Sequence, residues 1–312
     1  MSRAFVFPGQ GAQTIGMGKE LADAYPAARA VFEEVDDALG ESLSGLIWDG
    51  DIETLTLTQN AQPVLMATSM AAMRALEAEG VGIDAASFVA GHSLGEYSAL
   101  AAAGALSVSD AARLLRARGQ AMQEAVPVGV GAMAALLGLD LDAVRAVAEE
   151  AAGDQVCQAA NDNDPAQVVV SGHKEAVERA IEIAKAKGAK RAVLLPVSAP
   201  FHCALMAPAA EVMAEALSTV QINAPAVPVI ANVLAAPESD PDRIRSLLVE
   251  QITGAVRWRE SVIEMGAQGV TEIWEIGAGK ALSGMVRRID REIATQNIAT
   301  PADVQAAAES IK

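Results

Sequence analysis

Short apolar runs alternate with amphipathic stretches along most of the chain, and this pattern predicts a mostly parallel β-sheet covered by helices, an α/β fold. Buried strands are expected at 4–7, 87–90, 227–233 and 272–276. Helices are expected at 19–39, 61–79, 94–103 and 109–124. Pro63 would then lie in the first turn of its helix, where a missing N–H costs little. The alanine-rich, polar segment 299–312 is expected to be a weakly ordered tail.

The middle of the chain shows a different order, β-α-β-β-α-β, which is typical of ferredoxin-like units. Its strands are expected at 132–137, 157–161, 167–171 and 192–196, and its helices at 141–151 and 175–187. Glycine and proline mark the two ends of this segment. We therefore interpret 126–197 as a ferredoxin-like subdomain. It interrupts a large catalytic α/β domain, with an α/β-hydrolase-like core, formed by 1–125 and 198–312.

The composition of the chain excludes several classes of function. The chain has 312 residues, and its 23 Lys and Arg against 40 Asp and Glu give a net charge of −17, which argues against binding nucleic acid or anionic membranes. Two cysteines cannot build a disulfide framework, so we expect a reducing compartment, the cytoplasm. The N-terminus does not resemble a signal peptide, and no uncharged apolar run of about 18 residues follows, so no membrane association is expected.

The sequence Gly91-His92-Ser93-Leu94-Gly95 is a G-x-S-x-G motif between a predicted strand and a predicted helix. A strand-turn-helix elbow of this kind holds its serine in a strained turn. It also places the serine at a helix N-terminus, where free backbone N–H groups favour an oxyanion. We predict that Ser93 is a nucleophile; an inert serine in a glycine-flanked turn is the alternative.

A serine nucleophile needs a base, and the chain has three histidines. His202 lies in an irregular stretch after the last predicted strand of the subdomain and is the expected base, with a satisfied buried histidine as the alternative. His92 is expected to pack against or orient the elbow, and His173 to be a surface or helix-capping residue. Cys157 and Cys203 are interpreted as buried, inert thiols.

The glycine-rich segment 8–13 follows the first predicted strand directly. It lacks the third glycine of the G-x-G-x-x-G dinucleotide motif, because residue 14 is threonine, and no P-loop pattern fits around Lys19. We therefore expect a flexible loop that brings a backbone N–H close to the serine, with Gln10 as the candidate donor.

Arg118 interrupts an otherwise apolar helical stripe formed by Ala111, Leu115 and Met122. A guanidinium on a buried stripe requires a partner, because an uncompensated buried charge is costly. Two interpretations remain open here. One is a structural ion pair with an Asp or Glu, and the other is a bidentate grip on a substrate carboxylate.

Several motifs together resemble those of malonyl-CoA:acyl carrier protein transacylases of bacterial fatty acid synthesis. They occur in order at 7–13, 58–63, 91–97, 167–172, 201–202 and 275–280. The resemblance extends from about residue 4 to residue 290. The serine usual in the first glycine-rich loop is replaced by Ala12.

The resemblance implies roles for matching residues. It implies that Ser93 is the nucleophile and His202 its base, in a dyad without a third, acidic member. It further implies an oxyanion hole formed by the backbone N–H groups of Gln10 and Leu94. Arg118 would bind the malonyl carboxylate.

Three more positions match with supporting roles. The backbone carbonyl of Gln251 would orient the histidine, and Asn161 would line the site. A phenylalanine directly before the histidine, here Phe201, is similar to the residue found at this position in malonyl-selecting acyltransferases.

The implied reaction moves a malonyl group from malonyl-CoA to the phosphopantetheine thiol of acyl carrier protein through a malonyl-serine, without metal or organic cofactor. Carrier proteins of this pathway are acidic, so docking on this acidic chain would need a local basic patch. Candidates are Arg287 and Arg288 on one segment and Lys190 and Arg191 on another; ordinary solvated charges are the alternative.

Three other functions remain open. An α/β-hydrolase-like esterase or thioesterase would share the elbow but would want an acid between Ser93 and His202 in chain order. A discrete polyketide-type acyltransferase would load another acyl unit by the same mechanism. A non-catalytic module that binds carrier protein would not need the nucleophile at all.

Overall fold

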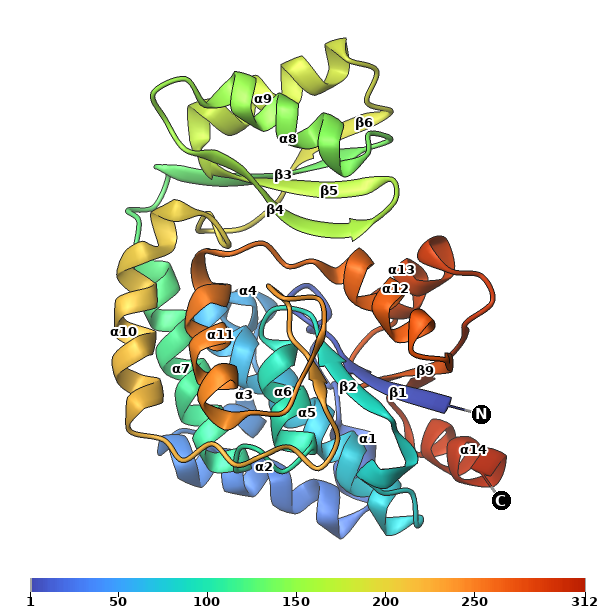
Figure 1. The fold of residues 1–312 in the computed structure, drawn as a ribbon. Coiled ribbons are helices and arrows are strands. Elements are labelled where there is room, and N and C mark those ends of the chain that lie inside the picture. Colours follow the sequence, from blue (N-terminus) through green and yellow to red (C-terminus); the bar gives the residue numbers. More distant parts are fainter. Residues whose placement is uncertain (1, 312) are drawn as a thin grey trace.

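The computed structural model describes residues 2–311, which form a six-stranded and a four-stranded sheet (Figure 1). The larger sheet has the order β10-β9-β1-β2-β7-β8. Its strands are β1 Ser2–Phe7, β2 Phe88–Gly91, β7 Val229–Ile230, β8 Pro237–Glu238, β9 Val270–Ile276 and β10 Ala294–Ile298. Every pairing is parallel except that of β7 with β8, so the predicted α/β class with a mostly parallel sheet is confirmed.

Strand β1 is central and buries both of its faces. Phe5 and Phe7 point into the larger core on one side, and Ala4 and Val6 into a second core on the other. This alternation follows from the two-residue repeat of a strand. The larger core is covered by α1 Lys19–Ala24, α2 Pro26–Leu39, α3 Leu43–Asp49, α4 Ile52–Thr56, α5 Thr58–Ala78, α6 Gly95–Ala102, α7 Val108–Glu124, α10 Ala207–Ser218, α11 Pro241–Thr253 and α14 Pro301–Ile311. The second core is covered by α12 Trp258–Ala267 and α13 Ala281–Ile289.

The smaller sheet is antiparallel and has the order β4-β5-β3-β6, the ferredoxin-like arrangement. Its strands are β3 Gly131–Leu137, β4 Cys157–Asp164, β5 Gln167–His173 and β6 Arg191–Leu194, and its helices are α8 Leu141–Ala152 and α9 Lys174–Ala186. Both helices lie on the face turned away from the larger sheet (Figure 1). Ala134 and Leu136 pack under these helices, whereas Met133 and Ala135 join the larger core.

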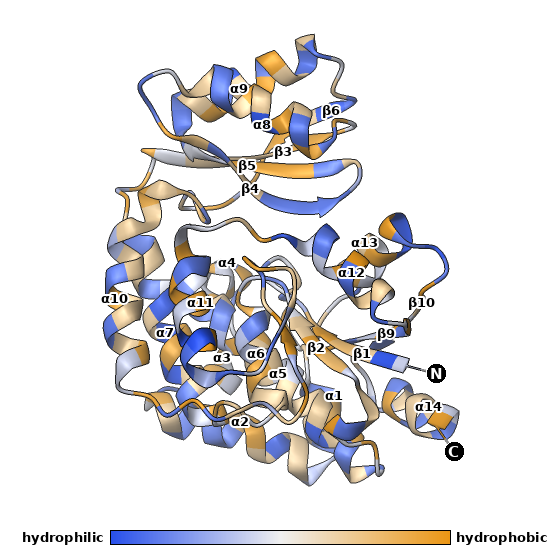
Figure 2. Cartoon of the chain, in the orientation of Figure 1, coloured by the Kyte–Doolittle hydropathy of each residue, from blue (hydrophilic) through white to orange (hydrophobic). Residues whose placement is uncertain are grey.

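Strand β4 joins the two parts of the molecule, although it is largely hydrophilic (Figure 2). Its backbone pairs with the segment before α12, because Asp162 N donates to Val256 O at 2.9 Å and Val256 N donates to Ala160 O at 2.8 Å. The buried carboxylate of Asp162 also lies 2.8 Å from Arg259 Nη2 of α12. Backbone hydrogen bonds and an ion pair thus satisfy these buried polar groups of the strand.

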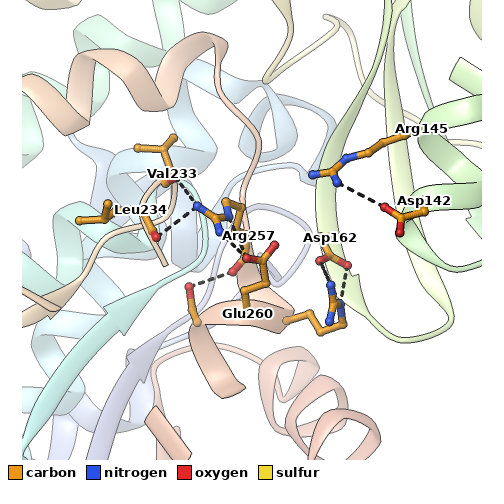
Figure 3. A network of polar contacts seen from close by, with 9 residues as sticks. Asp142, Arg145, Asp162, Val233, Leu234, Arg257 and Glu260 are labelled. Carbon is orange, nitrogen blue, oxygen red and sulfur yellow. Dashed lines mark hydrogen bonds and ion pairs between the residues drawn. The ribbon is translucent and has the colours of Figure 1, made fainter. Parts of the chain in front are cut away.

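The start of α12 carries a further polar contact beside this junction (Figure 3). Arg257 donates to the carbonyls of Val233 at 3.1 Å and Leu234 at 3.2 Å and pairs with Glu260. These bonds tie α12 to the loop after β7. That loop borders the serine elbow, as described below.

Several expectations from the sequence are wrong, and two of them concern whole elements. The helix expected at 19–39 is two helices, because Tyr25 is extended (φ −127°) and stands before Pro26, which disfavours helical backbone in the preceding residue. The expected weak tail instead contains helix α14. Val304 and Ala307 on one face of α14 are fully buried, so tertiary packing stabilises a segment whose composition suggested little order.

The helix expected at 61–79 begins earlier, at Thr58, which places Pro63 inside it rather than in its first turn. Proline cannot donate to the carbonyl four residues before it, which here is Gln59 O. Arg116 Nη1 donates to that carbonyl at 2.7 Å and replaces the missing bond. The strand expected at 227–233 is also shorter, since only Val229 and Ile230 pair with β2.

Candidate active site

The serine elbow depends on close contacts between backbone segments. Ser93 has φ 54°, a left-handed conformation that is uncommon for residues other than glycine. A Cβ on Gly91 would lie 1.9 Å from Gly95 C, and a Cβ on Gly95 would lie 2.3 Å from Phe7 O. Neither position therefore tolerates a side chain, and the tight turn between β2 and α6 exposes the Ser93 side chain to the pocket.

Ser93 and His202 are in direct contact. Ser93 Oγ lies 2.7 Å from His202 Nε2, and His202 Nδ1 lies 2.9 Å from the carbonyl oxygen of Gln251. A carbonyl only accepts, so Nδ1 carries the proton and the Nε2 lone pair faces the serine. Burial, together with the nearby charge of Arg118, lowers the pKa of His202 to about 3. The imidazole is therefore neutral at pH 7 and able to accept the hydroxyl proton.

Arg118 is fully buried beside this pair. Its Nη1 donates to Gln62 Oε1 at 2.7 Å, and its Nη2 donates to Gln251 Oε1 at 2.8 Å and to Ser93 Oγ at 3.0 Å. Within residues 2–311, no carboxylate lies within 4.0 Å of its guanidinium nitrogens. The structure therefore does not contain the ion pair that was one of the two interpretations of this residue. It leaves a buried cation held by neutral groups.

Asn232, two residues after the end of β7, is a site residue that the sequence did not indicate. Its Oδ1 accepts from Ser93 N at 2.8 Å, and its Nδ2 donates to Gly91 O at 2.6 Å. One amide thus bonds the backbone on both sides of His92 and holds the elbow. Nothing local in the sequence marks Asn232, because it reaches the elbow only through the pairing of β7 with β2.

Glu96 was also missed, although it belongs to the 91–97 motif. It is 1% exposed, and its Oε2 accepts from Gln251 Nε2 at 2.9 Å and from Asn232 N at 3.0 Å. Gln251 Nε2 also donates to Ser93 O at 3.0 Å. The side chain of Gln251, not only its carbonyl, therefore connects the residues around the nucleophile.

A second hydrogen-bonded chain leads from Arg118 to the glycine-rich loop. Gln62, which accepts from Arg118, donates through Nε2 to Thr58 Oγ1 at 3.1 Å. Thr58 Oγ1 in turn donates to Gln10 Oε1 at 3.0 Å. The start of α5 thus positions both the buried guanidinium and the side chain of the loop residue.

A pocket of ≈ 520 Å³ opens onto Ser93 and His202 between the two sheets. Gln10, Leu94, Asn161 and Phe201, four residues singled out from the sequence, line this pocket together with Arg118. Among residues 2–311, the backbone N–H groups of Gln10 and Leu94 donate to no other protein group. Both are free to bind a ligand, as an oxyanion hole requires.

The remaining histidines and cysteines have other surroundings. His92 Nε2 contacts Asn163 Oδ1 of β4 at 2.9 Å, so His92 connects the elbow to the smaller sheet. His173 precedes α9, and its Nδ1 accepts from Val156 N at 2.9 Å. Cys157 and Cys203 are free and buried, and burial raises the pKa of both thiols. Across residues 2–311, no group of three or more His, Cys, Asp or Glu side chains is placed to hold a metal ion.

The basic residues proposed for docking are not equivalent. Arg288 Nε lies 2.7 Å from Asp164 Oδ2, a carboxylate that is 1% exposed, so Arg288 joins α13 to β4. Arg287 Nε donates to Thr295 Oγ1 at 2.9 Å and contacts no carboxylate in the described chain. Lys190 and Arg191 are exposed before and at the start of β6.

A nucleophilic serine, a neutral histidine and free backbone N–H groups in one pocket can form and discharge an acyl-serine, the chemistry of an acyltransferase or a related hydrolase. Comparison with known families separates these two classes. The model of the acyl transferase domain family matches residues 4–300. The chain therefore belongs to the acyl transferase domain family.

Individual relatives are similar over nearly the full length. The malonyl CoA-acyl carrier protein transacylase of Bacillus subtilis is 48% identical over 310 residues, which cover 99% of this chain and 97% of the relative. The crystal structure of an acyl-carrier-protein-S-malonyltransferase from Bartonella henselae is 57% identical, with a TM-score of 0.98 over 100% of this chain and 99% of that one. A malonyl-transacylase in complex with a type II PKS acyl-carrier protein is 44% identical, with a TM-score of 0.96 over 99% of this chain and 100% of that one.

Proposed function

We propose that this protein transfers a malonyl group from malonyl-CoA to the phosphopantetheine thiol of an acyl carrier protein, as a step of fatty acid biosynthesis. The observation that carries the proposal is the contact of Arg118 with the hydroxyl of Ser93, opposite His202. A cation beside the nucleophile suits an acyl group that ends in a carboxylate. The names and near-complete coverage of the relatives support the same substrate and acceptor.

In the first half-reaction, His202 Nε2 takes the proton of Ser93 Oγ as the oxygen attacks the thioester carbonyl. The oxyanion is held by the N–H groups of Gln10 and Leu94, and each such donor is worth about 3 kcal/mol. The C–S bond then breaks, and the imidazolium returns its proton to the departing coenzyme A sulfur. Malonyl-serine remains, with its carboxylate held by Arg118.

In the second half-reaction, His202 takes the proton of the phosphopantetheine thiol. The sulfur attacks the malonyl-serine carbonyl, the C–O bond breaks, and Ser93 regains the proton. Both halves use the same base and oxyanion donors, so ping-pong kinetics are expected. No step uses a metal or an organic cofactor.

The contact of His202 with a backbone carbonyl argues against the hydrolase alternative. Hydrolases of the α/β type place an acid on the second nitrogen of this histidine. Here that nitrogen bonds to Gln251 O. The polyketide-type alternative shares every catalytic group proposed above, and the relative solved with a PKS carrier protein is itself named a malonyl-transacylase. The two alternatives differ in the acyl unit that is loaded rather than in the chemistry, and loss of malonyl preference in a competition between acyl-CoA donors would favour the polyketide-type enzyme.

We also propose that the protein acts in the cytoplasm. The two free, buried thiols fit a reducing compartment. Among residues 2–311, no helix is long and apolar enough to cross a membrane. The net charge of −17 argues against a nucleic acid partner.

Intact-mass spectrometry after brief mixing with malonyl-CoA tests the proposal, with Ser93→Ala as the matched variant. We expect one malonyl adduct on the native chain, none on the variant, and loss of the adduct when holo-acyl carrier protein is added. Steady release of free malonate without carrier protein would instead support a hydrolase. Absence of both adduct and turnover would remove malonyl-CoA as the donor.

A further inference from the structure

Glu96 is a buried carboxylate with no cation in contact. It lies in the first turn of α6, three residues after Ser93, and both groups that donate to it are neutral amides, the side chain of Gln251 and the backbone of Asn232. In the described part of the chain, no Lys, Arg or His nitrogen lies within 4.0 Å of its oxygens. A buried carboxylate without an ion-pair partner is costly in a fold and requires an explanation.

The nearest source of compensation is Arg118, one amide away. Arg118 Nη2 donates to Gln251 Oε1, and Gln251 Nε2 donates to Glu96 Oε2, so the amide transmits the guanidinium charge toward the carboxylate. All three side chains are 0–1% exposed. Before substrate arrives, Arg118, which lines the pocket, and Glu96, which does not, are therefore separated by a single hydrogen-bonded amide.

Other charges around Glu96 are neutralised or lie elsewhere. On α6 itself, the neighbouring ionisable group is the phenol of Tyr97, which is neutral at pH 7, and burial raises its pKa further. His202 is also neutral. The charges on the elements packed against this helix lie in ion pairs that do not involve Glu96: Arg3 with Glu272 on β1, Arg74 with Glu77 on α5, and Arg113 with Asp110 and Arg116 with Glu41 on α7. Glu124 of α7 is exposed. On α11, which carries Gln251, Arg243 pairs with Glu250, Arg245 donates to the carbonyl of Val220, and Asp242 is exposed.

A malonyl group would change this balance. On the proposed function, its carboxylate binds Arg118, so that two carboxylates depend on one buried guanidinium. Two anions that share a site cannot both stay ionised without a large cost in free energy. The carboxylate whose ionised form is stabilised less by its surroundings takes up a proton. Glu96, which has only amide donors, is that group.

We propose that Glu96 is a specificity-determining residue, which takes up one proton from solvent when a substrate carboxylate binds Arg118 and releases it when the malonyl group leaves. An acyl group without a carboxylate leaves the Arg118–Gln251–Glu96 arrangement unchanged and takes up no proton. The inference rests on the proposed function. Burial, opposed by Gln251, Asn232 and Arg118, raises the pKa of Glu96 to about 7, so both protonation states are accessible near neutral pH.

The test uses isothermal titration calorimetry on the full-length Ser93→Ala chain, which binds but cannot be acylated. Malonyl-CoA and acetyl-CoA are titrated from pH 6 to pH 9, at each pH in two buffers of different ionisation enthalpy, and the buffer dependence of the heat gives the protons exchanged. Acetyl-CoA carries the same coenzyme A phosphates, so their titration cancels in the comparison. We expect an uptake that approaches one proton per malonyl-CoA above pH 7 and fades toward pH 6.

Linkage also predicts the effect on affinity. Where one full proton is taken up, the Kd for malonyl-CoA rises about tenfold per pH unit, while the Kd for acetyl-CoA stays flat. Adding Glu96→Gln to the Ser93→Ala chain should abolish both the uptake and the pH slope for malonyl-CoA. Glu215→Gln, at an exposed position of α10, removes the same charge and should change neither.

The outcomes separate this inference from the function on which it rests. Equal proton uptake with malonyl-CoA and acetyl-CoA, or undiminished uptake after Glu96→Gln, overturns the role of Glu96. Zero uptake on the Ser93→Ala chain across the whole pH range also overturns it, and does not depend on whether the Glu96 variant folds. Equal affinity for both thioesters, unaffected by Arg118→Ala, would instead refute carboxylate recognition and the proposed function.

Discussion

Arg118 Nη2 donates a hydrogen bond to Ser93 Oγ at 3.0 Å, and the same oxygen lies 2.7 Å from His202 Nε2. The nucleophile therefore sits between a fixed cation and a neutral base. The cation favours negative charge on the serine oxygen and disfavours positive charge on the imidazole. It also lies close enough to the serine that the free carboxylate of a short acyl chain reaches it from the acylated oxygen.

Arg118→Ala should separate malonyl from acetyl transfer. Removing a charge-assisted bond to the carboxylate costs about 1.5–3 kcal/mol, so kcat/KM for malonyl-CoA should fall about 10–100-fold while that for acetyl-CoA falls less or rises. Both values are measured with the same carrier protein. Arg118→Lys keeps the charge without the planar fork and should recover part of the loss. An equal loss for both thioesters would identify a structural arginine.

The ionisation of His202 should depart from that of an ordinary histidine. Because burial and Arg118 lower its pKa from 6.5 to about 3, the ring should stay neutral as the pH falls through 6.5. Nitrogen-15 NMR of histidine-labelled protein, with His202→Gln to assign the signal, follows this directly between pH 5 and pH 8. Titration of the His202 signal between pH 6 and pH 7 would contradict the buried, cation-flanked environment.

The lowered pKa of His202 also makes the free energy of unfolding depend on pH. The unfolded chain protonates His202 below pH 6.5, whereas the folded chain does not do so until about pH 3, so the free energy of unfolding falls as the pH drops through this window. His202→Gln should reduce this acid sensitivity between pH 6.5 and pH 5. Denaturant unfolding of both chains at several pH values measures the difference, and identical slopes would count against it.

Asn232→Ala should impair acylation more than binding. The variant leaves Ser93 N and Gly91 O without their bonds, and each unsatisfied buried group costs about 1–3 kcal/mol. We expect a slower burst of acylation and a lower Tm, with little change in the Kd for malonyl-CoA on the Ser93→Ala background. Asn232→Asp keeps the acceptor for Ser93 N but loses the donor to Gly91 O. A weaker Kd with an unchanged burst rate would show that Asn232 acts on binding rather than on the elbow.

Charge reversal should distinguish two neighbouring arginines of α13. Arg287→Glu should weaken transfer to the carrier protein, because it places a negative charge opposite an acidic partner. It should spare acylation by malonyl-CoA, because the hydrogen bond of the Arg287 side chain goes to Thr295 and not to a residue of the pocket. Arg288→Glu should also lower Tm, because it places a like charge beside the buried Asp164. Separate assays of the two half-reactions and thermal unfolding measure these effects. If both half-reactions are unchanged in Arg287→Glu, this part of α13 does not dock the carrier protein.

Local patterns in the amino-acid sequence were sufficient to predict the strand before the elbow, the helix after it, most of the other helices and the α/β class. Each of these depends on periodicity and on glycine or proline at fixed offsets, which act over a few residues. The same patterns misjudged 19–39 and 299–312, because Pro26 changes the backbone before it and α14 is stabilised by burial against distant residues. A short helix that is stabilised by packing against residues distant in the sequence is hard to recognise from its own composition.

The residues around Ser93 also fall into two groups, those that the sequence indicated and those that only the tertiary structure placed there. The elbow motif and the histidine were visible as local or family patterns, but the bonds made by Asn232, Glu96 and the Gln251 side chain were not. Asn232 and Gln251 lie 139 and 158 residues from Ser93. Asn232 reaches Ser93 because β7 and β2 run parallel and end at one edge of the sheet, and Gln251 reaches it because the last turn of α11 packs beside the elbow. Burial of Arg118 and Glu96 on either side of the Gln251 amide sets their charge states, and only the tertiary structure decides which groups are buried together.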